Sequence, residues 1–542
     1  MSTPVAMPRP RLPRQVPYII GNEACERFSF YGMRNILVQF LVSSVILAYL
    51  PEAERDATAK DVFHSFVIGV YFFPLLGGWL SDRFFGKYNT VLWFSLIYCA
   101  GHACLAMFED SRNGFFTGLF LIALGSGGIK PLVVSFVGDQ FDQTNKHRAR
   151  VVFDAFYWII NFGSFFASLL MTLVLRNRGP AWAFGIPGIL MFIATMIFWL
   201  GRRQYVNVPP VAHDPDGFLE VVKSALLRHG HGTGTAVAAV GVVAAVLMLL
   251  LWAVAKLTGA PVWSPSLGFV ITFCLSLGAL IAGVGWGASL QLERARDSHP
   301  PAAVDGVRAV LRVLIVFALV TPFWSLFDQK ASTWVLQGGE MVMPTFAALP
   351  DGIAAFLRDW FASPSQMQAL NPLFVMALIP FNNLVVYPAL RRLGFNPTPL
   401  RRMGWGIAIS ALAWVVAGAI QLRLDAGAEL SIGWQTWPYL LLTFGEVLVS
   451  ATALEFAYSQ APHAMKGVIM AFWYLTSTFG GLWVLLTNEG VRHPAVIAWI
   501  GGQGWSENAF LMFFFAGFAA LAALAFAAYA RTYRMQEHYR RA

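Results

Sequence analysis

The chain has 542 residues, of which 57% are hydrophobic and 12% are charged. A soluble domain carries roughly 25% charged residues, so this composition excludes an ordinary soluble protein and indicates one that crosses a membrane repeatedly. The formal net charge of +9 would also suit nucleic-acid binding. The basic residues follow a membrane topology instead, so no nucleic-acid partner is expected.

The sequence contains many stretches that could cross a bilayer, each of which needs about 20 largely apolar residues. We predict an all-α polytopic membrane protein with 14 transmembrane helices, at 18–50, 61–81, 88–108, 114–137, 151–175, 181–200, 235–257, 266–290, 307–336, 366–390, 403–423, 436–460, 466–487 and 507–530.

The basic residues are distributed unevenly between the predicted loops. If the N-terminus is cytoplasmic, 25 of the 38 Lys and Arg residues lie in inside loops and tails, nine lie in outside loops and four lie within spans. An excess of Lys and Arg on the cytoplasmic side is the rule for membrane proteins. We therefore expect a multi-pass plasma-membrane protein with both termini in the cytoplasm. Residues 1–17 lack the pattern of a cleaved signal peptide.

The first span opens with the charged block GNEACERFSFYGMR, residues 21–34. At about 100° per residue, Glu23, Arg27, Tyr31 and Arg34 share one helix face, and Glu26 stands about 60° to the other side. Ionisable residues within a span are costly and indicate a functional site. The alternative is that Glu23 and Arg27, four residues apart, form only an internal ion pair near the membrane surface.

The fourth span contains the string GSGGIKP, with Lys130 between a glycine cluster and Pro131. Glycines allow helices to approach closely, and proline loosens the local backbone. We therefore expect Lys130 to face a cavity. The alternative is a lysine whose side chain extends to the membrane surface. The four cysteines, Cys25, Cys99, Cys104 and Cys274, have no metal-ligand spacing and are expected to be packing residues without a metal.

Setting aside the pair of spans at 235–257 and 266–290, which contains no charge apart from Lys256 in its connecting turn, leaves six spans on each side. Two six-helix halves resemble the major facilitator superfamily, in which one half rocks against the other. The segment GGWLSDRFFGK, residues 77–87, resembles the loop signature of that superfamily. We predict tails at 1–17 and 531–542, bundles at 18–201 and 307–530, and cytoplasmic linkers with the inserted pair at 202–306.

The second half supplies mostly carboxylates. Asp328 and Lys330 lie in the seventh core span, and Glu446 and Glu455 lie in the tenth. Glu446 and Glu455 are nine residues apart and therefore on opposite helix faces. We favour Glu446 for a central cavity and interpret Glu455 as a packing or cytoplasmic-end residue.

At these residues the sequence resembles a known family. Glu23, Glu26, Arg27, Phe28, Tyr31 and Gly32 match the ExxERFxYYG signature of the proton-dependent oligopeptide transporters. The strings GGIKP, GDQFD, FWSLFDQ, GEVLVS and LEFAYSQAP resemble other blocks of that family, and the inserted pair resembles the two extra helices of its bacterial members. The resemblance therefore implies a bacterial inner-membrane transporter.

The resemblance also implies roles for single residues. Arg27 and Lys130 would bind the carboxylate of a peptide and Glu446 its amine, while Glu23 and Glu26 would be proton-linked carboxylates. Two gate pairs are implied, Arg34 with Asp328 and Lys130 with Glu446. The remaining implied substrate contacts are hydrogen bonds from Tyr31, Tyr71, Asn161 and Asn371, and a side-chain pocket lined by Trp473. Packing is the alternative for Tyr71, Asn161, Asn371, Trp324, Trp334 and Trp473, because 15% of the chain is aromatic.

The sequence departs from the family pattern at two positions. Phe30 replaces the first tyrosine of the signature, which removes one hydroxyl group. Lys330 stands where relatives more often have glutamine, so it would neutralise Asp328 and leave the gating partner of Asp328 in doubt.

We therefore expect a monomeric proton-coupled symporter that imports di- and tripeptides without a cofactor. One alternative is a transporter of the same fold for nitrate or another small anion, although a plain anion has no need of Glu446. Another is a nutrient-sensing transceptor. An enzyme is not expected, because His64 and His102 lie alone in separate helices and His213, His229 and His231 lie in a cytoplasmic loop.

Overall fold

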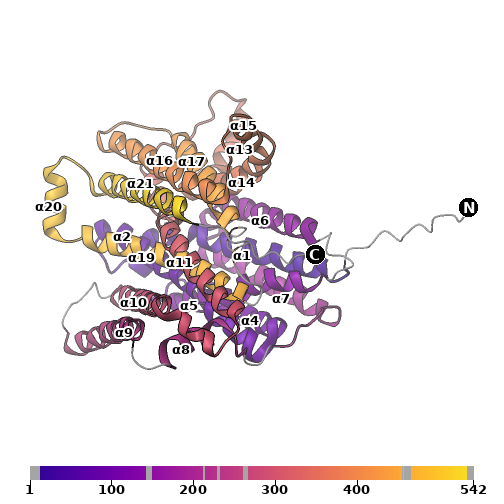
Figure 1. Ribbon diagram of the computed structural model, residues 1–542. Coiled ribbons are helices and arrows are strands. Elements are labelled where there is room, and N and C mark those ends of the chain that lie inside the picture. The colour runs from indigo at the N-terminus through magenta and orange to yellow at the C-terminus, as the bar shows by residue number, and fades with distance from the viewer. Residues whose placement is uncertain are drawn as a thin grey trace, which may run out of the picture. The chain divides into compact units, whose positions relative to one another are not determined.

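The computed structural model describes residues 13–141, 149–210, 214–228, 232–259, 267–453, 456, 460 and 465–533. Across these ranges the chain forms helices joined by connections of different lengths (Figure 1). One isolated β-bridge pairs Val342 with Ser431 in these ranges. The all-α prediction is confirmed. Glu455, His213, His229 and His231 lie outside the described residues, so their predicted places are untested.

Contacts divide the chain into two compact units. Unit 1 contains residues 1–34 and 73–212. Its helices are the first part of α1 (Val16–Ser43), α3 (Pro74–Leu80), α4 (Gly86–Met107), α5 (Arg112–Asp139), α6 (Ala149–Arg178) and α7 (Pro180–Leu200). Within this unit α4 packs on α5 and α7, and α3 packs on α5.

Unit 2 contains residues 35–72 and 213–542. It therefore includes the end of α1 together with all of α2, although both precede α3 in the chain. The two predicted bundles stay a prediction, because clusters of contacts are not folding domains. The helices of unit 2 are α2 (Glu52–Phe72), α8 (Phe218–Leu227), α9 (Thr233–Thr258), α10 (Gly268–Gln291), α11 (Pro301–Phe327), α12 (Thr333–Gly339), α13 (Asp351–Trp360), α14 (Leu370–Phe381), α15 (Tyr387–Arg392), α16 (Pro399–Asp425), α17 (Thr436–Glu446), α19 (Lys466–Val491), α20 (Pro494–Gly502) and α21 (Glu507–Thr532).

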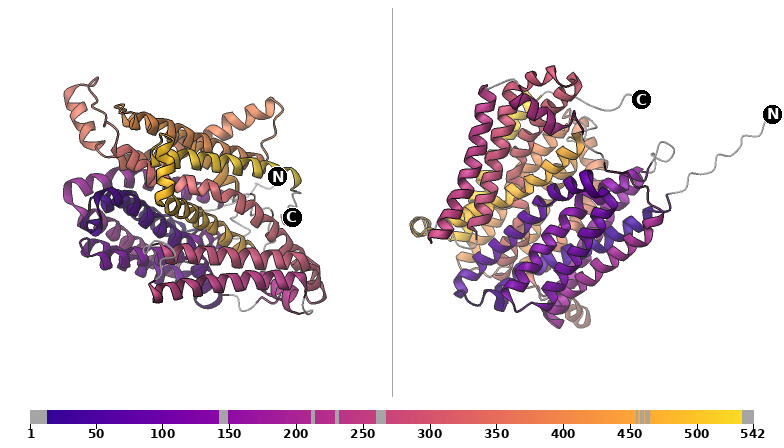
Figure 2. Two further views of the ribbon diagram at one scale, coloured as in Figure 1. Left: turned by 90° about the vertical axis from the view of Figure 1, so that its left-hand side faces the viewer. Right: turned by 90° about the horizontal axis from the view of Figure 1, so that it is seen from below.

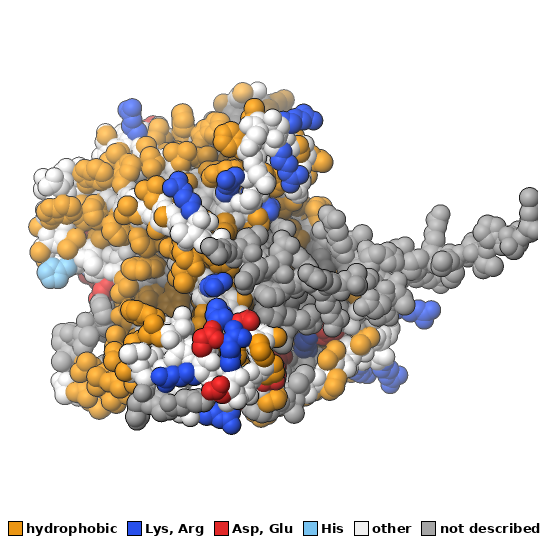
Figure 3. Space-filling model, in the orientation of Figure 1, with side chains coloured by type: hydrophobic (Ala, Val, Ile, Leu, Met, Phe, Trp, Pro, Cys, Tyr) orange, Lys and Arg blue, Asp and Glu red, His pale blue; other side chains and the backbone are white. Residues whose placement is uncertain are grey.

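The helices have the length and composition of membrane spans. In the described residues, 11 helical stretches are long and apolar enough to cross a bilayer. One of them, Glu54–Met107, is 54 residues long and covers α2 from Glu54 onward together with α3 and α4. Hydrophobic side chains cover much of the surface in Figure 3. A surface of this kind suits lipid contact. The chain is a multi-pass membrane protein, and the exact count of 14 spans stays a prediction.

Close helix packing around α5 depends on its glycines. A Cβ atom added at Gly127 would lie 2.4 Å from Phe73 Cβ, and one added at Gly125 would lie 2.7 Å from Tyr98 Cβ. α5 continues as one α-helix through Pro131. The predicted close approach at this glycine cluster is therefore confirmed, and it places Lys130 on a tightly packed helix.

Replacing Gly127 by alanine is expected to lower the temperature of thermal unfolding, because the new methyl group has no space beside Phe73. Overpacking of this kind costs about 1–3 kcal/mol. Differential scanning fluorimetry of the purified protein in detergent measures the change. The matched control is Gly163→Ala, whose Cβ would have no neighbour closer than 3.5 Å. Equal unfolding temperatures for the two variants would contradict this account of the packing.

The inserted pair, α9 and α10, forms a tight hairpin within unit 2. A Cβ atom added at Gly241 would lie 2.6 Å from the Cα atom of Gly283, so the two backbones touch. The helices run side by side in both views of Figure 2. α10 packs on α19 through Ile271 and Cys274. At the end of α10, Glu293 pairs with Arg296 and Arg308 in a network that joins the hairpin to α11.

Two predicted spans are interrupted at the residues that the sequence singles out. The span at 307–336 is not continuous, because α11 ends at Phe327, a 3₁₀ turn covers Asp328–Ala331, and α12 begins at Thr333. α17 changes to a π-helical turn at Val447–Ala451, directly after Glu446. Interrupted helices within the membrane are tolerated where they line binding sites. Asp328 and Glu446 both lie at such interruptions.

Candidate functional site

The charged block of the first span forms a buried triad on α1. Arg27 Nε donates a hydrogen bond to Glu23 Oε1 at 2.5 Å and lies 3.2 Å from Glu26 Oε2. Both glutamates are fully buried, and Arg27 is 8% exposed. Three of the four carboxylate oxygens have no hydrogen-bond partner in the described part of the chain. The proposed ion pair between Glu23 and Arg27 therefore exists, with Glu26 as a third member.

The triad has an unbalanced charge if both carboxyl groups are ionised, because one guanidinium cannot neutralise two carboxylates. Burying an uncompensated charge is costly, and a buried carboxyl group avoids this cost by taking up a proton or by gaining a cation.

Lys130 of α5 lies against α1. Its Nζ atom is 3.3 Å from the centroid of the Phe30 ring, and both side chains are buried. An ammonium group over an aromatic face is stabilised by the ring quadrupole. The alternative of a lysine reaching to the membrane surface is wrong. The departure at Phe30 removes a hydroxyl group but keeps the ring that contacts Lys130.

Three further predicted residues lie in unit 1. Tyr31 packs edge to face against Phe30, with ring centroids 5.4 Å apart. Arg34 is buried. On α6, the side-chain amide of Asn161 donates to the backbone carbonyl of Tyr157 at 3.0 Å. Their roles toward a substrate stay predictions.

In unit 2, Glu446 and Asn371 form a hydrogen-bonded pair between α17 and α14. Asn371 Nδ2 donates to Glu446 Oε2 at 2.6 Å and to Thr443 Oγ1 at 3.0 Å. The Glu446 side chain is half-buried. The prediction for Asn371 depends only on the short string NPLF, but the structure places Asn371 beside Glu446, the carboxylate favoured for a cavity. The pair fixes the orientation of that carboxylate.

Asp328 lies at the break between α11 and α12 and is almost fully buried. Its Oδ2 atom accepts a hydrogen bond from Ser477 Oγ of α19 at 3.1 Å. Lys330 Nζ lies 2.9 Å from the centroid of the Phe327 ring. Neutralisation of Asp328 by Lys330 stays a prediction. Each predicted gate pair, Arg34 with Asp328 and Lys130 with Glu446, joins residues of different units and also stays a prediction.

The aromatic candidates make ring contacts within unit 2. Trp473 is buried, with its ring centroid 5.3 Å from that of Phe317 and 5.8 Å from that of Trp324. Tyr71 stacks on Tyr474 at 6.3 Å. These contacts are compatible with packing and with a wall of a binding site, so the predicted contacts of Tyr71 and Trp473 with a substrate remain untested.

A family model described as the POT family matches residues 88–251 and 296–492. The chain belongs to the POT family. This confirms the family that the motifs of α1, α5 and α17 resemble, and with it the all-α membrane-transporter fold. The division into two six-helix bundles stays a prediction.

Several relatives of this POT family chain are known. It is 31% identical to "Peptide transporter 3" of Caenorhabditis elegans over 77% of this chain and 52% of that protein. The chain thus spans about half the length of the curated relatives it matches. A crystal structure of an auto-inhibited POT family peptide transporter is 65% identical, covers 98% of this chain and 99% of its own, and has a TM-score of 0.90. A structure of a proton-dependent oligopeptide (POT) family transporter is 58% identical over 94% of this chain and all of its own, with a TM-score of 0.77.

Two histidines of this POT family member have partners that the sequence pattern does not indicate. His64 Nε2 of α2 is 3.0 Å from Ser332 Oγ, next to the break at Asp328, and His102 Nε2 is 2.9 Å from Ser29 Oγ. Both histidines lie in separate helices, as predicted, and each contacts a serine that the sequence does not single out. Serines within apolar spans are the signal that could have suggested these partners, but a serine alone does not identify which helix it contacts.

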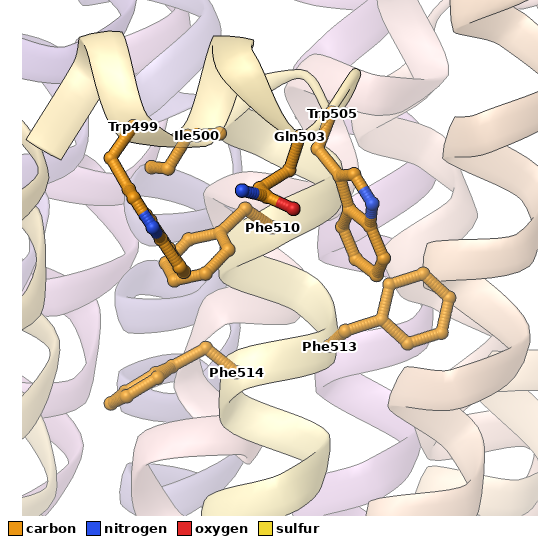
Figure 4. A pocket seen from close by; sticks show the side chains of 7 residues that line it. All are labelled: Trp499, Ile500, Gln503, Trp505, Phe510, Phe513 and Phe514. Carbon is orange, nitrogen blue, oxygen red and sulfur yellow. The ribbon is translucent and has the colours of Figure 1, made fainter.

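A pocket of about 310 Å³ lies between α20 and α21, at the start of the candidate span Glu507–Thr532 (Figure 4). Figure 4 shows that its walls are mainly aromatic, and the lining residues are Trp499, Ile500, Gln503, Trp505, Phe510, Phe513 and Phe514. Aromatic side chains commonly gather where a span meets the membrane surface. None of the predicted site residues lines this pocket. Among the described residues, no three His, Cys, Asp or Glu side chains form a candidate metal site.

Proposed function

We propose that this chain is a proton-coupled symporter that imports di- and tripeptides by alternating access. The observation that carries the proposal is the buried triad of Glu23, Glu26 and Arg27, in which two carboxyl groups share one guanidinium. A membrane-embedded group of this kind can couple proton binding to the binding of an anionic group. The names of the relatives, which include peptide transporters, support the proposal.

The peptide itself would be bound through its charged ends. Arg27 and Lys130 supply cations for its carboxylate, and Glu446, oriented by Asn371, supplies an anion for its amine. Opposite charges satisfy the two ends of a zwitterion that is about 3.3–3.6 Å long per residue. In the proposal, Tyr31, Arg34, Tyr71, Asn161 and Trp473 provide the remaining contacts.

Coupling follows from competition for Arg27. When the peptide carboxylate pairs with this guanidinium, it weakens the pairing of Arg27 with Glu23 and Glu26. A buried carboxyl group that loses its cation binds a proton more readily. Peptide and proton therefore bind together, and the gate pairs of Arg34 with Asp328 and of Lys130 with Glu446 open and close the two sides.

The remaining expectations belong to the same proposal. The protein lies in a bacterial inner membrane with both termini cytoplasmic, works as a monomer, and needs no cofactor because the proton gradient drives transport. A nitrate transporter of the same fold is less favoured, because the Glu446 and Asn371 pair offers nothing to a plain anion. A sensing role would appear as signalling that survives in a transport-dead variant.

The proposal is tested by uptake of dialanine into proteoliposomes. We expect uptake with an inward proton gradient and loss of that uptake with an uncoupler. Nitrate uptake is measured in parallel on the same preparation. Nitrate uptake without dialanine uptake, in protein shown to be folded by thermal unfolding, would overturn the peptide assignment.

Replacing Glu26 by glutamine is expected to abolish gradient-driven uptake but to keep exchange of internal for external dialanine. Exchange needs no net proton movement, whereas accumulation needs a group that titrates. Both modes are measured in the same proteoliposomes with radiolabelled dialanine. The matched control is Glu429→Gln, at an exposed carboxylate, which should keep both modes. Intact gradient-driven uptake in Glu26→Gln would exclude Glu26 as the coupling residue.

A further inference from the structure

Specific contacts between α2 and α19 place α2 in unit 2. Thr478 Oγ1 of α19 donates to the backbone carbonyl of Ile68 at 3.5 Å. A Cβ atom added at Gly481 would lie 2.8 Å from Ile68 Cγ1, so the two helices are in close contact there. With the stacking of Tyr71 on Tyr474, these contacts show that α2 lies along α19. The end of α1 is also held in this unit, because Gln39 Oε1 accepts hydrogen bonds from Ser363 and Ser365.

A charge cluster with a buried carboxylate joins the same two helices, at the third turn of α2 and at the end of α19. The carboxylate of Asp61, 1% exposed, pairs with Arg492 and accepts a hydrogen bond from Asn488 Nδ2 at 3.2 Å. Arg492 Nη1 also lies 3.6 Å from Glu489 Oε2. Lys60, beside Asp61, is 7% exposed. Two cations and two anions therefore gather at one helix contact.

The predicted topology places this cluster on the outside of the membrane. If the N-terminus is cytoplasmic, α1 runs outward, so the connection between α1 and α2 and the connection between α19 and α20 both lie outside. Asp61 is in the third turn of α2, and Arg492 follows the last residue of α19. The cluster is therefore at the outer end of the α2 and α19 contact.

We propose that Asp61, Asn488 and Arg492 form an outer clasp, which holds α2 against α19 while the outside is closed and separates when the outside opens. The inference rests on the proposed transport function. A buried carboxylate that loses its cation is strongly disfavoured until water reaches it. The outer clasp therefore makes outward opening depend on hydration of Asp61 and Arg492, and its three residues position α2 without touching the peptide.

The first test measures the distance between the connection that precedes α2 and the first turn of α17, both of which are outside in the predicted topology. Spin labels are attached at Tyr49→Cys and Trp437→Cys, which are exposed positions, in a chain whose four native cysteines are replaced. Pulsed electron resonance then gives the distribution of distances between the two labels. We expect Asp61→Asn and, in a separate variant, Arg492→Gln to raise the long-distance population by about threefold. Each substitution weakens the pair of Asp61 with Arg492 that holds the two helices together. Glu293→Gln, in the charged network after α10, is the matched control and should leave the distribution unchanged.

The second test closes the clasp covalently. Asp61→Cys with Asn488→Cys is cross-linked by a short bifunctional thiol reagent in proteoliposomes. Dialanine uptake is expected to fall about tenfold or more and to return after reduction. Undiminished uptake by the cross-linked protein, or an unchanged distance distribution in both charge variants, would overturn the outer clasp. If the uncross-linked protein imports no dialanine, the proposed function fails, and the spin-label distances still decide the clasp.

Discussion

Dialanine uptake by the Arg27→Ala variant is expected to fall by roughly 100-fold or more, because the lost charge-assisted contact is worth about 3 kcal/mol and each 1.4 kcal/mol is tenfold in affinity. Arg27 is also the only cation within 4 Å of Glu23 and Glu26 among the described ion pairs. The variant should therefore unfold at a lower temperature as well. Uptake into proteoliposomes and scanning fluorimetry measure the two effects.

A second substitution separates the loss of function from the loss of stability. Glu23→Gln together with Arg27→Ala removes one of the two buried carboxylates that pair with Arg27. We expect this double variant to recover part of the unfolding temperature but none of the uptake, because no guanidinium is left for the peptide carboxylate. Arg27→Lys is the conservative control. Recovery of uptake in the double variant would show that Arg27 acts only by stabilising the fold.

Helix geometry predicts much of this site from sequence. The spacing of four residues places Glu23 beside Arg27, and the structure has that ion pair. The same geometry sets Glu26 about 60° to the other side of Glu23 and thus about 100° from Arg27, yet Glu26 also contacts Arg27. A long, planar guanidinium with several donors reaches acceptors on both sides of its own position. Side-chain length therefore adds a partner that the angular position of Cα atoms does not predict.

Contacts between distant segments are the part that periodicity cannot predict. The pattern of apolar residues indicates which face of a helix is buried, but not which helix covers it. Three contacts are of this kind: the hydrogen bond between His64 and Ser332, the pairing of Asp61 with Arg492, and the grouping of α2 with unit 2. The sequence pattern does not predict the helix break at Asp328 either, because the string FWSLFDQKAS contains no glycine or proline that would indicate it.

Glu446→Gln is expected to weaken dialanine binding by about tenfold or more, because a neutral amide cannot form the ion pair that a carboxylate forms with an ammonium group. The substitution keeps an oxygen that can accept from Asn371, so the contact between α14 and α17 should survive. Binding is measured by isothermal titration of the purified protein with dialanine and with N-acetyl-dialanine, whose amine carries no charge.

The comparison between the two ligands decides the role of Glu446. If its carboxylate binds the peptide amine, wild-type protein prefers dialanine, and Glu446→Gln loses most of that preference. The matched control is Glu340→Gln, since Glu340 also accepts from a side-chain amide, that of Gln421 at 2.8 Å, and should keep the wild-type preference. A Glu446→Gln variant that still discriminates as wild type does would assign the amine to another group and leave Glu446 as a structural partner of Asn371.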